Sequence, residues 1–262
     1  MVERRRLKNH YRSLFVTTRR RPDHMHGSRY FLHDAAQTHV RLAQGHCIDV
    51  FDADGITSAS TGRESDLEVV LAQLAEIVSA SFGVSQSAEK SHGIRDRILN
   101  VDGLAIWHGG GQLHGFASMK AFPELRTCYL HGVSVRNESK GIGGSLHLAR
   151  AVIALMPDAA YFAFTTQNPV MYCLMTKVAR RTFPNPDRPT VPARFSDLGR
   201  QLIKGRRGTF DVETFVNREL YTQCLYPTLP RSRSHIANDW FDDSLDVKSG
   251  RTTDGFLFIG EL

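Results

Sequence analysis

The sequence predicts an α/β fold of the α+β type, in which short strands and helices follow one another along the chain. Residues 129–135 are rich in β-branched and aromatic side chains, which is typical of a strand. A glycine-rich turn joins them to apolar residues at helical spacing over 145–156. A second strand over 160–166 leads into a second helix, for which Asn168 is a typical N-cap and Pro169 a typical first residue. These two strand-to-helix units are the strongest indication of the fold.

Two short strands and a turn are predicted in the N-terminal part of the chain. Residues 30–32 and 47–51 have the apolar and aromatic composition of strands, and the Asp-Ala-Asp-Gly string at 52–55 is typical of a turn. Residues 1–30 have little apolar pattern, so we expect them to be irregular or only partly helical.

A strong helix is predicted to begin at Ser65 and to end at Gly83. Two acids follow Ser65 in the first turn, and apolar residues recur on one face. A weaker helix is predicted over 90–99. Residues 104–107 and 113–120 then form the two strands of a predicted hairpin.

The C-terminal part is less regular. A proline-rich loop follows Phe183, a short helix is predicted over 193–203, and residues 256–259 are expected to form a closing strand. Residues 199–254 form a long insertion, and loops of this kind often determine specificity.

Composition limits the classes of protein to which the chain can belong. With 262 residues it is long enough for one sizeable core, and no stretch reaches the length of a membrane span. No signal-peptide pattern precedes the first elements, so we expect a cytoplasmic protein without a membrane partner. The four cysteines are far apart in the sequence, which favours free thiols.

The formal charge of +6 is concentrated at the N-terminus. Residues 1–30 contain nine Lys or Arg and two acids, a balance of nine minus two, or +7. Such a basic arm can attract nucleic acid or another acidic partner. The alternative, which we favour, is an extension that packs on the body of the protein or on a partner subunit.

The Lys140-Gly141-Ile142-Gly143-Gly144 turn has the composition of a phosphate-binding site. Glycines let the backbone approach a ligand closely, and the N-terminus of the following helix attracts anions. A dinucleotide-binding fingerprint requires a third glycine where the chain has Leu146, and the string of a P-loop does not occur.

The turn resembles that of the GNAT acyltransferase superfamily. Its members pair a Val-x-Val strand end, here Val133-Ser134-Val135, with an Arg/Gln-x-x-Gly-x-Gly/Ala turn, here residues 138–143. Glu138 stands where the family usually has Arg or Gln, so either its side chain turns outward or Arg136 and Lys140 supply the positive charge. Asn168 corresponds to an Asn whose side chain bonds pantetheine in the family. The resemblance covers residues 60–185.

The resemblance implies a mixed central β-sheet flanked by helices and an acyl-CoA, such as acetyl-CoA, as the acyl donor. It divides the chain into a basic extension, 1–60, and a GNAT domain, 61–262, with its core at 65–185 and acceptor specificity within 186–262. The implied cofactor-binding residues are Val133, Ser134, Val135, Ser139, Lys140, Gly141, Ile142, Gly143, Gly144, Ser145 and Asn168.

In the family, the acyl group commonly passes directly to an amine in a ternary complex. His131, on the predicted central strand, is a candidate base, although a structural histidine is an equal alternative. Many members have a tyrosine seven residues after the Asn as acid for the leaving thiolate. Met175 occupies that position here, which leaves Tyr172, about one turn earlier, as the candidate acid, with a packing role as the alternative. Cys173 is expected to be a core thiol.

The sequence therefore predicts an acyl-CoA-dependent acyltransferase that acts on an unidentified amine or hydroxyl acceptor, with a homodimer left open. One alternative is an acyltransferase supplied by an acyl carrier protein. Another is a non-catalytic GNAT-like module whose basic arm binds nucleic acid. No metal site is expected, because His24 and His26 have no identifiable third ligand.

Overall fold

The computed structural model describes residues 36–42, 45–62, 64–83, 95, 98–188, 190–245 and 252–262. They form two compact units. Unit 1 holds the described residues of Met1–Ile77, Ser87–Met119 and Gly132–Leu155, and unit 2 those of Val78–Gln86, Lys120–His131 and Met156–Leu262. The strand β5 (Thr127–Val135) contributes to both units, because the boundary follows His131.

The sheet of unit 1 is antiparallel. β1 (Thr38–Arg41) pairs with β2 (Cys47–Asp52), β2 with β3 (Gly103–Gly109), and β3 with β4 (Gln112–Phe122), of which residues 112–119 belong to this unit. Gly110 and Gly111 join β3 to β4 with positive φ angles of 56° and 79°, which glycine adopts readily.

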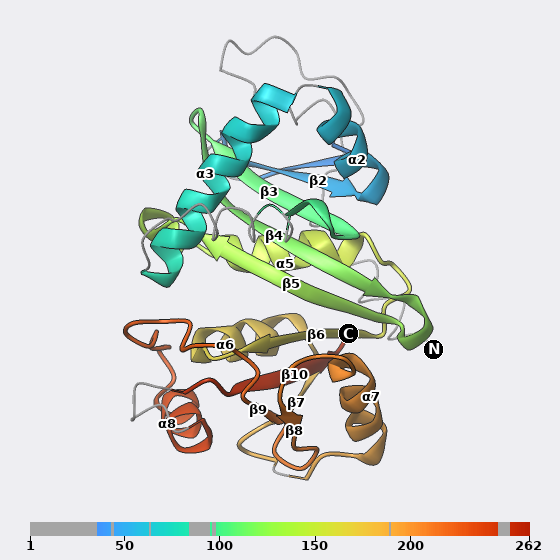
Figure 1. Ribbon diagram of the computed structural model, residues 1–262, viewed down its shortest axis with the longest axis vertical. Helices are drawn as coiled ribbons and strands as arrows, with labels where there is room; N and C mark the ends of the chain where they lie inside the picture. Colours follow the sequence, from blue (N-terminus) through green and yellow to red (C-terminus); the bar gives the residue numbers. More distant parts are fainter. Residues whose placement is uncertain are drawn as a thin grey trace. The chain divides into compact units, whose positions relative to one another are not determined.

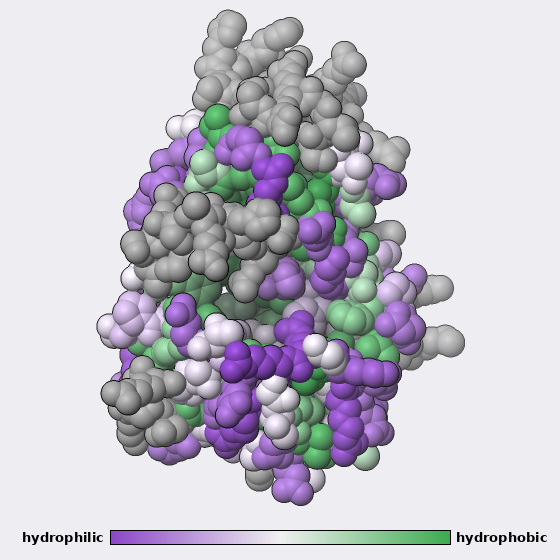
Figure 2. Space-filling view, viewed as in Figure 1, coloured by the Kyte–Doolittle hydropathy of each residue, from purple (hydrophilic) through white to green (hydrophobic). Residues whose placement is uncertain are grey.

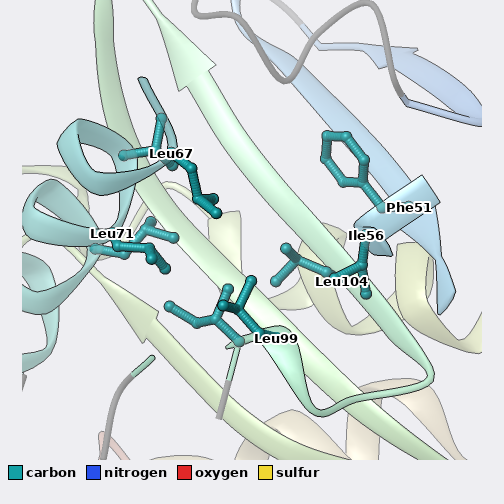
Figure 3. A pocket seen from close by; sticks show the side chains of 9 residues that line it. Phe51, Ile56, Leu67, Leu71, Leu99 and Leu104 are labelled. Carbon is teal, nitrogen blue, oxygen red and sulfur yellow. The ribbon is translucent and has the colours of Figure 1, made fainter. Parts of the chain in front are cut away.

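Helices cover both faces of this sheet (Figure 1). α5 (Gly144–Ala154) packs on the face that carries Trp107, because a Cβ placed on Gly144 would collide with the Trp107 ring. α2 (Ala53–Gly62) and the unit 1 part of α3 (Glu64–Phe82) lie on the other face. They line an apolar pocket with β2 and β3 (Figure 3). Its lining residues are Phe51, Ile56, Leu67, Val70, Leu71, Leu74, Ile98, Leu99 and Leu104. With no polar lining side chain, this pocket is a feature of the core.

The sheet of unit 2 is mixed. β5 pairs in parallel with β6 (Tyr161–Thr166), from Thr127↔Tyr161 to Tyr129↔Ala163. β10 (Gly255–Glu261) then pairs antiparallel with β6, with β7 (Arg181–Phe183) and with β9 (Val216–Arg218). The short strand β8 (Thr209–Phe210) pairs with β9. The predicted closing strand is therefore confirmed as β10, to which three other strands pair.

The two faces of β10 pack on different helices. Leu257 and Ile259 belong to the core that α7 (Ala193–Ile203) covers, together with Phe195. Phe258 faces the opposite way, toward α6 (Pro169–Val178) and α8 (His235–Ser244), where its ring lies 5.8 Å from that of Trp240. Within the described residues, two single-turn 3-10 helices add to these elements, Pro123–Leu125 in unit 2 and Asn137–Ser139 in unit 1.

The predicted fold class, mixed α/β with helices that flank the strands, is confirmed. The order from α3 through β3, β4, β5, α5 and β6 to α6 is the order expected from the resemblance. The predicted helix over 193–203 is confirmed as α7.

One local prediction is wrong. Residues 52–55 are not an isolated turn but the start of α2, because Asp52 Oδ1 accepts the N–H of Gly55 at 2.8 Å. Aspartate favours turns and helix N-caps alike, so its local pattern does not separate them. β1 and β2, which lie within the predicted extension 1–60, are part of the unit 1 sheet.

Several predictions fall outside the described residues: the basic arm 1–30, His24, His26, the strand 30–32 and most of the helix 90–99. Among the helices of the described ranges, none has the length and apolar character needed to cross a bilayer. Hydrophilic residues predominate over unit 2 on the face that Figure 2 shows.

Candidate functional site

The turn between β5 and α5 presents backbone to solvent. Gly141 and Gly143 have φ angles of 88° and 85°, and Ile142 between them is 62% exposed. Gly143 is the N-cap of α5 and contributes no side-chain cap, and the first helical bonds run from Leu146 and His147 to its carbonyl oxygen, at 3.0 and 3.2 Å. The N–H groups that precede these bonds point out of the helix, which is the arrangement that binds anions.

The three glycines of this turn are needed for two different reasons. A Cβ on Gly141 would meet no atom within 4 Å, and one on Gly143 would meet only His147, at 4.0 Å, so glycine is needed there for the positive φ. Gly144 is needed because α5 packs closely on Trp107. Open space around Gly141 and Gly143 leaves room for a ligand.

A buried histidine fixes the conformation of the turn. His114 Nδ1 lies 2.9 Å from Ser139 Oγ, and His114 Nε2 lies 3.1 Å from Gly109 O. A carbonyl oxygen only accepts, so Nε2 carries the proton and Nδ1 accepts from the Ser139 hydroxyl when the ring is neutral. Burial lowers the pKa of His114, which favours this neutral form. Ser139 is thus held in place by a side chain of the same unit, unit 1.

We expect the free energy of unfolding to fall as the pH drops below 6.5, the ordinary pKa of histidine. The folded-state pKa of His114 is lowered, so the unfolded chain binds the proton more tightly and acid favours unfolding. Urea unfolding measured between about pH 5 and pH 8 should show a shallower pH dependence for His114→Gln than for the parent. Equal slopes would contradict the assigned burial effect.

The positive charge of the turn comes from Lys140. Arg136 is occupied, since its Nε donates to Leu113 O at 2.7 Å and its other nitrogens lie 3.6 Å from Glu76 and 3.9 Å from Glu138. Glu138, the departure from the family pattern, is thereby partly neutralised. Lys140 is exposed, and within the described part of the chain no carboxylate pairs with it.

The Val133-Ser134-Val135 segment forms the end of β5 and belongs to unit 1. Val133 is half-buried, whereas Ser134 and Val135 are buried. A Cβ on Gly115 of β4 would lie 2.6 Å from Ser134 O, so glycine allows the two backbones to approach. The role of these residues, with Ser145 at the start of α5, in holding pantetheine stays a prediction.

In unit 2, Asn168 is the N-cap of α6, as predicted. Its Oδ1 accepts the Val170 N–H at 2.9 Å, which leaves its amide nitrogen as a donor. The side chain of Asn168 also lies close enough to Tyr226 to lower the pKa of its phenol, an effect that burial outweighs. Burial raises the pKa of Tyr226 to about 12, and its ring stacks on Phe82 at 5.0 Å.

Gln167 holds the segment that carries Tyr226. This fully buried side chain donates to Thr252 O at 3.0 Å and to Asp254 O at 2.8 Å, and its Oε1 accepts the Leu225 N–H at 2.9 Å. Neither Gln167 nor Tyr226 was predicted from the sequence as a site residue. The local sequence offers little to single out Gln167, because it shows only a polar residue between a strand and a helix N-cap.

The two predicted catalytic residues have different surroundings. His131 is exposed at the end of the unit 2 part of β5. Tyr172 is buried, with its ring 5.4 Å from Trp240 and 5.5 Å from Phe258, and burial raises its pKa. Tyr172 therefore packs in an aromatic cluster. Its catalytic role stays a prediction, and Tyr226 is a second candidate for that role.

A polar cluster lies on the α7 side of the unit 2 sheet. Thr165 Oγ1 accepts from Tyr129 Oη at 3.1 Å and from Arg206 Nη1 at 3.4 Å, and Tyr221 is hydrogen-bonded to the same threonine. The Arg206 guanidinium lies 4.4 Å from the centre of the Tyr129 ring. His131 shares a strand face with Tyr129, because alternate residues of a strand point the same way.

The four cysteines are free thiols, as predicted. Among the residues that the structure describes, no three His, Cys, Asp or Glu side chains form a group that could hold a metal ion.

No protein-family model and no curated protein matches the sequence. The search of solved structures finds ribosomal-protein-S18-alanine N-acetyltransferase from Escherichia coli, at 11% identity over 82% of this chain and 93% of that one, with a TM-score of 0.43. It also finds IAA acetyltransferase from Bacillus cereus, at 9% identity over 83% and 99%, with a TM-score of 0.42. A third is Tetrahymena GCN5, at 13% identity over 58% and 86%, with a TM-score of 0.41.

Some matched structures are longer proteins. The chain spans 49% of a proposed acetyltransferase from Pyrococcus horikoshii and 34% of N-acetylglutamate synthase from Neisseria gonorrhoeae, a structure complexed with coenzyme A and N-acetyl-glutamate. All of these likenesses have TM-scores below 0.5.

Proposed function

We propose that this protein is an acyltransferase that moves an acetyl or other acyl group from an acyl-CoA to an amine, or a hydroxyl, by direct transfer in a ternary complex. The observation that carries the proposal is the open turn at the N-terminus of α5. There Gly141 and Gly143 expose backbone N–H groups to an anion, and Lys140 adds a cation that pairs with no carboxylate of the described residues. The pyrophosphate of coenzyme A is such an anion.

The proposed transfer requires two proton movements. The amine nitrogen bonds to the thioester carbon and loses a proton, the carbon–sulfur bond breaks, and the thiolate takes up a proton. His131, exposed on β5, is the proposed base. Tyr226 is the better candidate acid, because it lies beside Asn168, a proposed pantetheine ligand, and its phenol stays protonated at neutral pH.

Thermal unfolding with and without acetyl-CoA tests the cofactor assignment, because a ligand that binds only the folded state raises the unfolding midpoint. We expect a rise with coenzyme A and acetyl-CoA, and release of free thiol from acetyl-CoA in the presence of an amine panel. Binding without transfer to any acceptor would favour the non-catalytic module, and no binding would contradict the proposal.

Tyr226→Phe is expected to lower kcat by about 10²-fold, the lower part of the range for a positioned acid. Tyr172→Phe makes the same chemical change within the aromatic cluster and is expected to leave kcat within about threefold of the parent. Both variants should bind coenzyme A like the parent. If Tyr172→Phe is the slower enzyme, the acid is Tyr172, as the sequence predicted.

A further inference from the structure

The geometry points to Arg206 as the anchor for a carboxylate on the acceptor, which makes the acceptor an amino acid or another amine that carries a carboxylate. This inference rests on the proposed acyltransferase function and names its substrate class. It starts from a half-buried guanidinium in unit 2, on the segment between α7 and β8.

The guanidinium of Arg206 is held in place, and no described carboxylate neutralises its charge. It lies over the Tyr129 ring, and its Nη1 donates to Thr165 Oγ1 at 3.4 Å, which occupies one of its five N–H donors. No carboxylate of the described ranges pairs with it. Among the acids of this region, Asp254 is paired with Arg218 at 2.6 Å, and Asp211 accepts from the Thr214 hydroxyl at 2.7 Å.

The neighbouring tyrosines do not supply the missing anion. Burial is the largest effect on Tyr129 and Tyr221, and it raises the pKa of both phenols despite the adjacent guanidinium. Both are therefore neutral at physiological pH. A partly buried cation with no counter-ion among the described residues carries a desolvation cost, which an anionic ligand would offset.

The surroundings fit a carboxylate. A planar guanidinium fork matches a carboxylate with two parallel hydrogen bonds, and the hydroxyl-bearing side chains beside it can add others. One guanidinium balances the single charge of a carboxylate. The doubly charged phosphate monoester is the competing anion.

The position of Arg206 relates it to the proposed chemistry. Arg206 lies over Tyr129, and His131 follows on the same face of β5, about 7 Å along the strand. A small amine whose carboxylate is held by Arg206 would thus place its nitrogen on the face that carries the proposed base. Tyr226, the proposed acid, lies close enough to Tyr221 of this cluster to contribute to the raised pKa of Tyr221, after the larger effect of burial.

The test compares acceptors that differ only in this charge. Amino acids and their carboxamides are offered to the parent with acetyl-CoA. We expect kcat/KM to favour the carboxylates by roughly 10- to 100-fold, the range for hydrogen bonds to a charged group. Arg206→Gln should remove this preference, and Arg206→Lys should keep part of it. Arg207→Gln removes the same charge from the exposed next residue and should leave the preference unchanged.

A direct binding measurement separates this inference from the proposed function. Calorimetric titration with N-acetylated amino acids and their amides needs no turnover, and we expect the parent and Arg207→Gln, but not Arg206→Gln, to prefer the acids. Failure to bind coenzyme A would count against the acyltransferase alone. Equal use and binding of acids and amides, a preference for phosphate-bearing amines, or an unchanged preference in a folded Arg206→Gln would overturn the assignment of Arg206.

Discussion

Replacing Gly143 with aspartate is expected to lower the affinity for coenzyme A by about 10² to 10³-fold, whereas asparagine at the same position should cost far less. Both residues tolerate the positive φ of 85° better than other side chains do, so the backbone strain is similar in the two variants. They differ by one negative charge beside the N-terminus of α5, where the pyrophosphate is proposed to bind. At about 4 Å, such a repulsion amounts to about 4 kcal/mol near a protein surface.

The measurement is calorimetric titration of coenzyme A into the parent, Gly143→Asp and Gly143→Asn. Gly110→Asp is the matched control, because Gly110 also has a positive φ, of 56°, and open space around it, but lies in the β3–β4 turn. This control should bind coenzyme A like the parent. A folded Gly143→Asp protein with parental affinity would show that the phosphates bind elsewhere.

The elements that the sequence predicted correctly are those whose pattern is local. α3 has a long apolar face, and α6 begins at an Asn-Pro pair whose side-chain cap is visible in the sequence. β1 and β7 to β9 were not predicted, because strands of two to four residues carry too little alternation to be recognised. α8 was hidden in a polar stretch, although Ser234 caps it through the Ala237 N–H.

In the candidate site too, the features with a local sequence pattern were predicted and the contacts between distant residues were not. The turn with Gly141 and Gly143 was visible in the sequence, since positive φ and a helix N-terminus impose a residue type at each position. Nothing in the sequence places Tyr226 beside Asn168 or Arg206 beside Thr165, because these contacts join residues that are distant in the chain. Gly144 shows the converse: the pattern assigned it to the cofactor, whereas the packing of Trp107 alone already requires a glycine there.

His131→Ala is expected to lower turnover by about 10² to 10⁴-fold, the usual contribution of a positioned base, with little change in the affinity for coenzyme A. The side chain is exposed and follows Tyr129 on one face of β5, so removing the imidazole leaves no cavity in the core. We therefore expect the unfolding midpoint to stay close to that of the parent.

The pH profile of kcat/KM distinguishes a base from a merely structural histidine. A base must be unprotonated to act, so the parent should lose activity toward acid as His131 takes up its proton, and His131→Ala should lose this acidic limb. His131→Gln, which keeps a hydrogen-bonding side chain but cannot take up a proton, should be as slow as His131→Ala. If either variant turns over within about threefold of the parent, proton removal falls to water or to the fraction of acceptor amine that is already neutral.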